Sequence, residues 1–564
     1  MLGTKSPNQD ILLQEERNGL PTRLVEQGDQ EDQFAEPEII PESEYISGWK
    51  LHLNTFALLL ALFAAQMEQS IVSTSVLAIT NELKGFDKSG WIFTAFLLTY
   101  TGLMMIWAKV SDIMGRKPLI LAAVFIFIVF SAACGASKTL TQLIVFRCLQ
   151  GIGGGGIFSL TVLIFFEMVP VRKFPTYGAL IMLILMCSVT FGPLLGGAIN
   201  NNTTWRWIFW LNIPICTISL VILVFLLPER FPGQHKTVTT QGADHSRIRG
   251  LLRTVDFIGA TLLLGTCVLL ITGMQQAAEG RSFSSRLVLP MLISSGVMLI
   301  AFFLWQRYIA ERNLPEPVFP WQLLTNRVYM GMILNSFFTG TILIVLTFQI
   351  PQRFQTVNGD SALKAGVRLI AFGLIAPFGS TVSAIIVGKT RIPPIYILIL
   401  GGFLEIVGTV GLSKSPSGYE IWPTQYAFQV IAGLGVGCFN AILMLMVPVV
   451  VKKQELAIGT AAITQFRVLG GTIGLAIVIS AMNRTIRPDL LQVLSPEQVN
   501  SVLDTTSIIK SFPSEVQTIV RTIFGRGYNL QMEIMVGFAV AQLPSTLLMW
   551  TRTPIMIPSS KSDN

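Results

Sequence analysis

The sequence predicts an all-α integral membrane protein, and three observations lead to that class. The chain of 564 residues is 51% hydrophobic and only 13% charged, whereas soluble domains carry about twice that share of charged residues. Its apolar residues gather in runs near the roughly 20 residues that a helix needs to cross a bilayer core. Several runs also contain ionisable side chains, which are rare in lipid and mark a polar interior. We therefore expect spanning helices around a polar path.

The apolar runs number fourteen, and most of the connections between them are short. The expected spans are approximately 52–79, 90–108, 119–136, 141–165, 178–199, 207–227, 254–274, 287–306, 329–350, 364–387, 395–413, 422–450, 458–481 and 527–550.

Positive charge predicts the orientation of these spans. Short cytoplasmic loops of membrane proteins are enriched in Lys and Arg, and here both are more frequent in the loops on the side of the N-terminus. An even number of spans then puts both chain ends in the cytoplasm. The N-glycosylation triplets at Asn201, Asn202 and Asn483 fall on the outer side, which agrees. We expect the plasma membrane, with the vacuolar membrane as the alternative.

A weak internal repeat predicts the domain organisation. Span four contains Phe146-Arg147-Cys148-Leu149-Gln150-Gly151-Ile152-Gly153, and span twelve contains Phe428-Gln429-Val430-Ile431-Ala432-Gly433-Leu434-Gly435. Related parallel halves with a site between them are a transporter architecture. We expect a disordered acidic cytoplasmic tail at 1–49, a six-helix bundle at 50–228, a cytoplasmic loop at 229–253, two inserted helices at 254–306, a second six-helix bundle at 307–550 with a long outer loop at 482–526, and a cytoplasmic tail at 551–564.

Several functional classes are disfavoured by the residues that the chain contains. The six cysteines lie scattered in apolar runs and the three histidines lack ligand spacing, so neither a disulfide framework nor a metal site is expected. The glycine-rich stretch 151–156 and the triplet Gly388-Lys389-Thr390 lack the spacing of a phosphate-binding loop. We expect no cofactor, no nucleic-acid partner and no enzymatic activity, and a monomer in the lipid bilayer.

Two ionisable residues inside spans are candidates for proton coupling. Arg147 lies in span four and Glu68 halfway along span one. A carboxyl group that alternates between a dry and a wet environment can load and release a proton. The alternatives are that Arg147 extends toward the membrane surface or pins neighbouring helices, and that Glu68 is a hydrogen-bonded structural residue.

The loop after span two combines a carboxylate, a tight turn and two cations. Its residues Asp112, Gly115, Arg116 and Lys117 can lock helix ends together at the cytoplasmic side and form a gate. The alternative is an ordinary basic inner loop. In span five, Gly192, Pro193, Gly196 and Gly197 put a break and small residues into a helix that must still cross the membrane.

These stretches resemble the major facilitator superfamily. Residues 108–117 are similar to its loop 2–3 signature Gly-x-Leu-x-Asp-x-x-Gly-Arg-Lys, with Ala108 and Val110 as departures. Residues 143–151 are similar to its span-four motif, residues 192–197 to its antiporter motif with Ser188 in place of a preceding glycine, and residues 205–214 to a signature of the fourteen-span drug:proton antiporters. The amino-acid sequences of spans one and two are most similar to those of fungal toxin and multidrug exporters.

The resemblance implies the major facilitator fold and a proton-coupled antiporter. It implies export of small lipophilic molecules such as drugs, toxins or secondary metabolites by alternating access, with proton roles for Arg147 and for Glu68, which stands where the antiporters usually carry aspartate. The rival functions are a vacuolar basic amino acid transporter, another solute carrier of this fold, or a transporter-like sensor. Embedded polar residues are candidates to line the cargo cavity, namely Gln349, Gln429, Asn440, Gln465 and Arg467.

Overall fold

The computed structural model describes residues 45–83, 90–170, 173–229, 256–278, 282–312, 319, 321–390, 392–451, 456–504 and 506–557. The chain divides into two compact units, 1–44 and 45–564, and every described residue belongs to the second. The acidic tail expected at 1–49 and the cytoplasmic loop expected at 229–253 therefore lie almost wholly outside the described residues.

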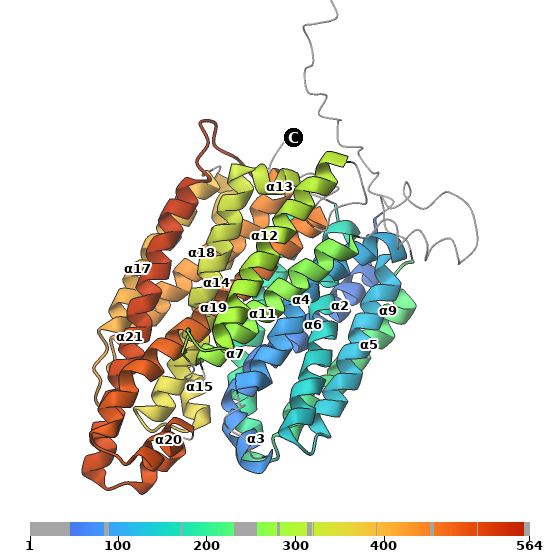
Figure 1. The fold of residues 1–564 in the computed structure, drawn as a ribbon. Coiled ribbons are helices and arrows are strands. Elements are labelled where there is room, and N and C mark those ends of the chain that lie inside the picture. The colour runs from blue at the N-terminus through green and yellow to red at the C-terminus, as the bar shows by residue number, and fades with distance from the viewer. Residues whose placement is uncertain are drawn as a thin grey trace, which may run out of the picture. The chain divides into compact units, whose positions relative to one another are not determined.

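The N-terminal helices pack mainly against one another. Here α4 and α5 both lie against α6, and α2 lies against α7 and α9 (Figure 1). Their bounds are α2 Trp49–Ile71, η2 Val72–Thr74, α3 Val76–Leu83, α4 Gly90–Met114, α5 Arg116–Gly135, α6 Leu140–Met168, α7 Phe174–Asn202, α8 Arg206–Trp210 and α9 Asn212–Leu226.

The C-terminal helices form a second packed group, in which α14 lies against α19 and α21, and α18 against α16 and α17. Between the groups, α11 and α12 form a pair, and α11 contacts both α4 and α19. The bounds are α11 Phe257–Ala278, α12 Val288–Arg312, α13 Trp321–Thr325, α14 Arg327–Thr356, α15 Ala362–Gly373, α16 Ile375–Thr390, α17 Pro394–Ser413, α18 Gln425–Val450, α19 Leu456–Leu491, α20 Pro496–Asp504, η7 Thr506–Ser511 and α21 Ser514–Leu547.

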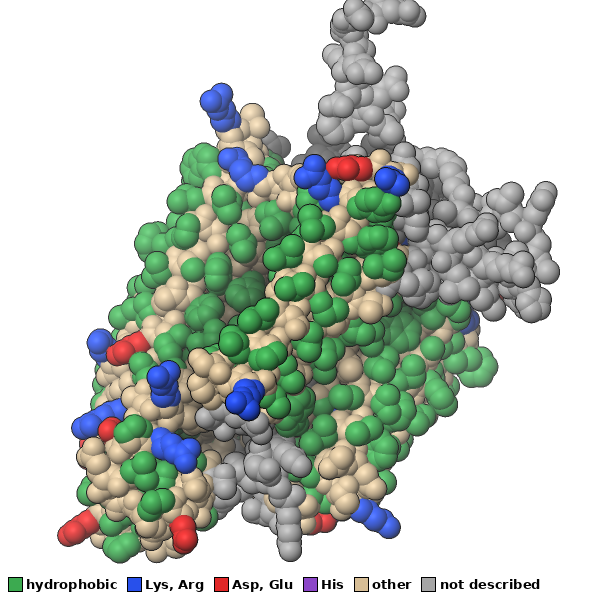
Figure 2. All heavy atoms as spheres, viewed as in Figure 1, with side chains coloured by type: hydrophobic (Ala, Val, Ile, Leu, Met, Phe, Trp, Pro, Cys, Tyr) green, Lys and Arg blue, Asp and Glu red, His purple; other side chains and the backbone are tan. Residues whose placement is uncertain are grey.

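The prediction of an all-α multi-pass membrane protein is confirmed. The described residues contain no strand, and 12 of their helices are long and apolar enough to cross a membrane. On the face that Figure 2 shows, charged side chains gather toward the two ends of the helices and leave a largely apolar band between them. The described apolar part of α11, Ile258–Met274, is shorter than a span, and α21 is not among the 12. The count of fourteen and the domain boundaries stay predictions.

The segment expected to form a long outer loop at 482–526 is largely helical. Helix α19 continues to Leu491, α20 follows, and α21 already begins at Ser514. Apolar residues from these elements pack into a cluster of their own that includes Ile486, Val499 and Phe524. The segment differs from an irregular loop because its apolar side chains bury one another and so stabilise the helices.

Close approach of α6 to its neighbours depends on glycine. A Cβ atom added at Gly153 would lie 2.7 Å from the carbonyl oxygen of Ala123 and from the amide nitrogen of Phe127, both on α5. At Gly154 it would lie 3.0 Å from the ring of Phe96 on α4. Helices in lipid associate through van der Waals contact at small residues. The glycine run therefore brings α4 and α5 against α6 and positions the polar groups between them.

We predict that Gly153→Ala lowers the thermal unfolding temperature of the detergent-solubilised protein. The added methyl group meets backbone atoms of α5, and overpacking of this kind costs about 1–3 kcal/mol. Gly296→Ala on α12 is the matched control, because a Cβ there meets nothing within 4 Å and alanine favours a helix. Equal unfolding temperatures for the two variants would contradict the packing argument.

Candidate functional site

The two predicted coupling residues form a buried ion pair. The Arg147 guanidinium on α6 contacts the Glu68 carboxylate on α2, and both side chains are 0% exposed. The second carboxylate oxygen accepts a hydrogen bond from Asn212 Nδ2 at the start of α9. Arg147 Nε donates to the carbonyl oxygen of Ile92 on α4 at 2.9 Å, and Nη1 donates to Gln150 Oε1 at 2.9 Å. Four helices therefore supply partners to one ion pair.

Aromatic rings enclose the same guanidinium. Its carbon lies 4.5 Å from the centre of the Phe96 ring and 5.6 Å from that of Phe209, distances at which the faces of aromatic rings attract cations. Arg147 Nη2 has no hydrogen-bond acceptor among the described residues. Since the side chain is wholly buried, the alternative in which it extends to the membrane surface does not fit. A role in pinning helices is compatible with the same contacts.

A chain of contacts connects this pair with the interface between the two helix groups. Phe96 stacks on Tyr100 with ring centres 5.6 Å apart. Gln66 Nε2 donates to the Tyr100 hydroxyl oxygen at 2.9 Å, and Gln69 Nε2 donates to Gln66 Oε1 at 2.7 Å. Both glutamines lie on α2, which also carries Glu68. Helix α4, which carries Tyr100, packs against α19 of the C-terminal group.

Across that interface lie two of the five predicted cavity residues. Arg467 on α19 is half-buried, and its Nη1 donates to Asn440 Oδ1 on α18 at 3.2 Å. Tyr100 lies within electrostatic range of the Arg467 guanidinium. Met444, one turn after Asn440 on α18, and Val468, the residue after Arg467 on α19, belong to the core cluster that contains Tyr100. The structure therefore brings Asn440 and Arg467 to the N-terminal helices.

The other three predicted cavity residues do not join this cluster by any hydrogen bond among the described residues. Gln465 turns toward α11, where its Nε2 lies 3.9 Å from Cys267 Sγ. Gln349 and Gln429 are buried, and Gln349 Nε2 and both polar side-chain atoms of Gln429 have no partner in the described part of the chain. Residue type and depth were visible in the sequence, but the direction in which each helix face turns was not.

The antiporter motif lies between the two helix groups. A Cβ at Gly192 would meet the Ile71 amide nitrogen at 2.9 Å, and one at Gly196 would meet the Ile71 carbonyl oxygen, so this face of α7 fits closely against α2. Pro193 stands inside α7. The neighbouring Leu194 lies on the side of Gly366 in α15. Gly197 is buried. Helix α7 thus contacts α2 on one side and α15 on the other.

Ser188, which stands where the antiporter motif carries glycine, also holds α7 to α2. Its hydroxyl donates to the Phe63 carbonyl oxygen at 3.2 Å and to the Ile184 carbonyl oxygen at 2.7 Å, and Ser70 Oγ donates to the Ser188 carbonyl oxygen at 2.9 Å. The serine therefore adds hydrogen bonds to a contact that small residues make close.

At the C-terminal end of α4, the predicted charge lock involves a residue that the sequence analysis missed. Gly115 is the N-cap residue just before α5 and has a φ of 94°, a value that favours glycine. Arg116 then forms an ion pair with Glu167 on α6 at 2.7 Å. Lys117 is half-buried, and the side chain of Asp112 lies outside the described residues. Glu167 stands at the end of an apolar run, which was its one visible signal.

Asn201 and Asn202 are exposed at the end of α7, and Asn483 is half-buried within α19. Nearby, Arg206 donates to Glu82 at 2.6 Å, and this hydrogen bond holds the pKa of the Glu82 carboxyl below its usual value. The pair links α3 to α8 beside the glycosylation candidates.

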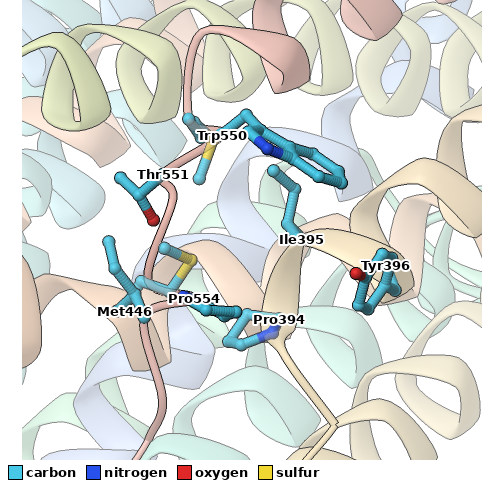
Figure 3. A pocket seen from close by; sticks show the side chains of 9 residues that line it. Pro394, Ile395, Tyr396, Met446, Trp550, Thr551 and Pro554 are labelled. Atoms are coloured by element: carbon cyan, nitrogen blue, oxygen red, sulfur yellow. The ribbon is translucent and has the colours of Figure 1, made fainter.

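A pocket lies at the other end of the C-terminal helices, between the start of α17 and the segment after α21 (Figure 3). Tyr396 and Trp550 are among its lining residues, and it includes none of the predicted site residues. The described residues also contain no cluster of His, Cys, Asp and Glu that could hold a metal ion.

Comparison with known proteins agrees with this architecture. The family model described as Major Facilitator Superfamily matches residues 58–475. The MFS-type transporter FPY5 of Fusarium mangiferae is 40% identical over 91% of this chain and 86% of its own length. The efflux pump aflT of Aspergillus parasiticus is 28% identical over 77% of this chain and 82% of its own length.

Solved structures of low identity share the fold. A bacterial homologue of the human lysosomal transporter Spinster, in an inward-facing and occupied conformation, superposes with a TM-score of 0.58 at 13% identity, over 90% of this chain and 100% of its own. The proton:xylose symporter XylE gives 0.55 at 12% identity, over 92% and 99%. From the matched family model and the 40% identical relative, the chain belongs to the major facilitator superfamily.

Proposed function

We propose that this transporter is a proton-coupled antiporter that exports small lipophilic organic molecules by alternating access. The buried ion pair of Glu68 and Arg147 is the observation that carries the proposal. A carboxylate held inside a membrane by one cation is a group whose charge can be switched by one proton. Relatives named efflux pumps support the outward direction.

Protonation of Glu68 would change what holds four helices together. The neutral acid loses its attraction for Arg147 and leaves a buried cation without a counter-charge, a state that costs several kcal/mol. The bundle can relieve that cost by rearranging α2 against α6, so that the guanidinium meets water or another acceptor. Return of the carboxylate restores the original packing. One proton thereby biases the equilibrium between two arrangements of the N-terminal helices.

The proton site and the cargo site share structural elements, which provides the coupling. Helix α2 carries both Glu68 and Gln66, and Gln66 is hydrogen-bonded to Tyr100. Arg147 lies over Phe96, which stacks on Tyr100. A movement of the ion pair would therefore shift the groups that contact Tyr100. If protonation of Glu68 changes the affinity for a cargo molecule beside Tyr100 by some factor, binding of that cargo must change the affinity of Glu68 for a proton by the same factor.

Helix α7 would control access from the outer side. It contacts α2 through Gly192 and Gly196 and faces α15 at Leu194. A second contact joins the groups where Phe93 on α4 meets Phe348 on α14, edge to face at 5.4 Å. We propose that these contacts close the outer side and separate in the outward-open state. Small residues and the proline inside α7 permit such movement because neighbouring helices can slide without steric conflict.

We further propose the plasma membrane, with both chain ends cytoplasmic and glycans on the outer asparagines. The rival function in basic amino acid transport is disfavoured by the Arg467 cation at the interface, with which no carboxylate among the described residues forms an ion pair.

Replacing Glu68 by Gln should reduce pH-gradient-driven export at least ten-fold, because an amide cannot take up a proton. Transport of a panel of lipophilic fluorescent probes is measured in sealed vesicles that contain the purified protein, with and without an imposed pH gradient. Glu311→Gln is the matched control, since that carboxylate forms an exposed ion pair with Arg307. Gradient-driven export by Glu68→Gln at the wild-type rate would refute the coupling role.

Gly196→Leu should reduce export several-fold and raise passive leak, with the protein still inserted in the membrane. The larger side chain must displace the α2 backbone at Ile71. Pro193→Ala should reduce export without the steric conflict. Gly178→Ala on the same helix is the control, because the nearest atom to its added Cβ is the end of a leucine side chain at 4.0 Å. Wild-type rates and leak in both test variants would remove the gate proposal.

Glu167→Arg should lower transport by reversing a charge opposite Arg116, and the double variant Arg116→Glu with Glu167→Arg should recover a substantial part of it. The reason is that the ion pair joins the start of α5 to α6. The measurement is initial export rate normalised to protein amount. A double variant no better than the single one would argue against a direct electrostatic role.

A further inference from the structure

The interface between the helix groups holds hydrogen-bond donors for which the described residues supply no acceptor. Among the described residues, Arg467 donates to one partner, Asn440 Oδ1, although a guanidinium carries five N–H groups. The amide nitrogen of Asn440 is buried and has no acceptor in the described part of the chain. The Tyr100 oxygen accepts from Gln66, and the Gln69 side chain also lies within hydrogen-bond range of the same hydroxyl. Arg467 and Asn440, which are hydrogen-bonded to each other, thus carry donors without an acceptor, and Tyr100 lies within electrostatic range of this pair.

The charge at this interface is positive and is not balanced by a carboxylate among the described residues. No carboxylate among the described residues forms an ion pair with Arg467. The Glu68 carboxylate is engaged by Arg147 and Asn212. Glu405 on α17, a buried carboxyl group of the C-terminal helices, lies against Gly435 of α18. A cation within a membrane is expensive unless it is paired or faces water, so the site favours a ligand that brings negative charge.

We propose that the exported cargo is a weak organic acid whose anionic group binds between Arg467, Asn440 and Tyr100. This inference rests on the proposed export function and adds the chemical class of the cargo. Hydrogen bonds from a charged donor to a carboxylate or an ionised enol are about twice as strong as neutral ones. A quaternary ammonium compound would meet repulsion from Arg467.

The rest of such a molecule has apolar surroundings. Phe158 lies 6.4 Å from the Tyr100 ring, centre to centre, and Met444 and Val468 complete the same core cluster from α18 and α19. An acid with an aromatic or aliphatic body therefore satisfies both parts of the site, the donors with its anionic group and the apolar side chains with its body. A small hydrophilic acid would satisfy only the donors.

The test compares matched probes that differ in one group. Carboxylic acids built on naphthalene, anthracene and pyrene are set against the corresponding amides and primary amines. Binding to the purified full-length protein is measured by probe fluorescence, without any gradient. We expect at least one acid to bind at least ten-fold more tightly than its amide and the amine to bind most weakly. Equal affinity of acid and amide on every ring system would overturn the proposal.

Variants locate the effect. Arg467→Met should abolish the preference for the acid while affinity for the amide is kept, and Arg467→Lys should retain part of it. Asn440→Leu provides a second variant in case Arg467→Met does not fold, and it should also weaken the preference. Arg487→Met is the matched control, because Arg487 is exposed on the same helix and donates to Asn500 at 3.0 Å. An undiminished acid preference in both Arg467→Met and Asn440→Leu would overturn the site.

Measurement of transport under a pH gradient distinguishes a failure of this inference from a failure of the proposed function. Wild-type protein that binds the acids selectively but moves none of them under a pH gradient supports the cargo site and contradicts proton-driven export. Protein that exports amides and acids equally under a gradient supports export and contradicts the acid preference.

Discussion

The ion pair between Glu68 and Arg147 is the interaction on which the N-terminal helices depend. Each charge alone would cost several kcal/mol inside the membrane. Together they are compatible with burial only because Asn212, Ile92 and Gln150 supply further hydrogen-bond partners from α9, α4 and α6. In the proposed cycle the same pair responds to pH, since a single proton on Glu68 would remove one of its two charges.

Small residues allow these polar contacts to form at all. Apolar side chains gain little by moving from lipid to a protein interface, so helices in a bilayer need close van der Waals contact. Glycines supply it where α6 meets α5, where α7 meets α2, and where Gly470 of α19 meets the backbone of Phe337 on α14. These contacts set the distances at which long polar side chains can reach one another, and they are smooth enough to permit sliding.

The two helix groups differ in the partners that they provide for charged side chains. The N-terminal group holds a matched pair, while the C-terminal group presents Arg467 at the interface with an amide as its hydrogen-bond partner. Tyr100 stands between them, linked to one side through Phe96 and within electrostatic range of the other. A net-neutral ion pair next to the Arg467 cation suits the proposed cycle, in which protons and a negatively charged cargo would move in opposite directions.

Sequence alone determined the all-helical membrane class, and it predicted roles for Glu68, Arg147 and the span-five glycines, because the cost of placing a residue in lipid depends on its type and depth. The sequence did not determine which polar side chains contact one another. Glu68 and Arg147 lie on different helices, Arg116 pairs with a glutamate that no motif marked, and Gln465 turns away from the residues with which it was grouped. Those outcomes depend on how each helix is rotated against its neighbours. Rotation is decided by the fit of side chains far apart in the sequence, so only the tertiary structure decided which polar groups meet.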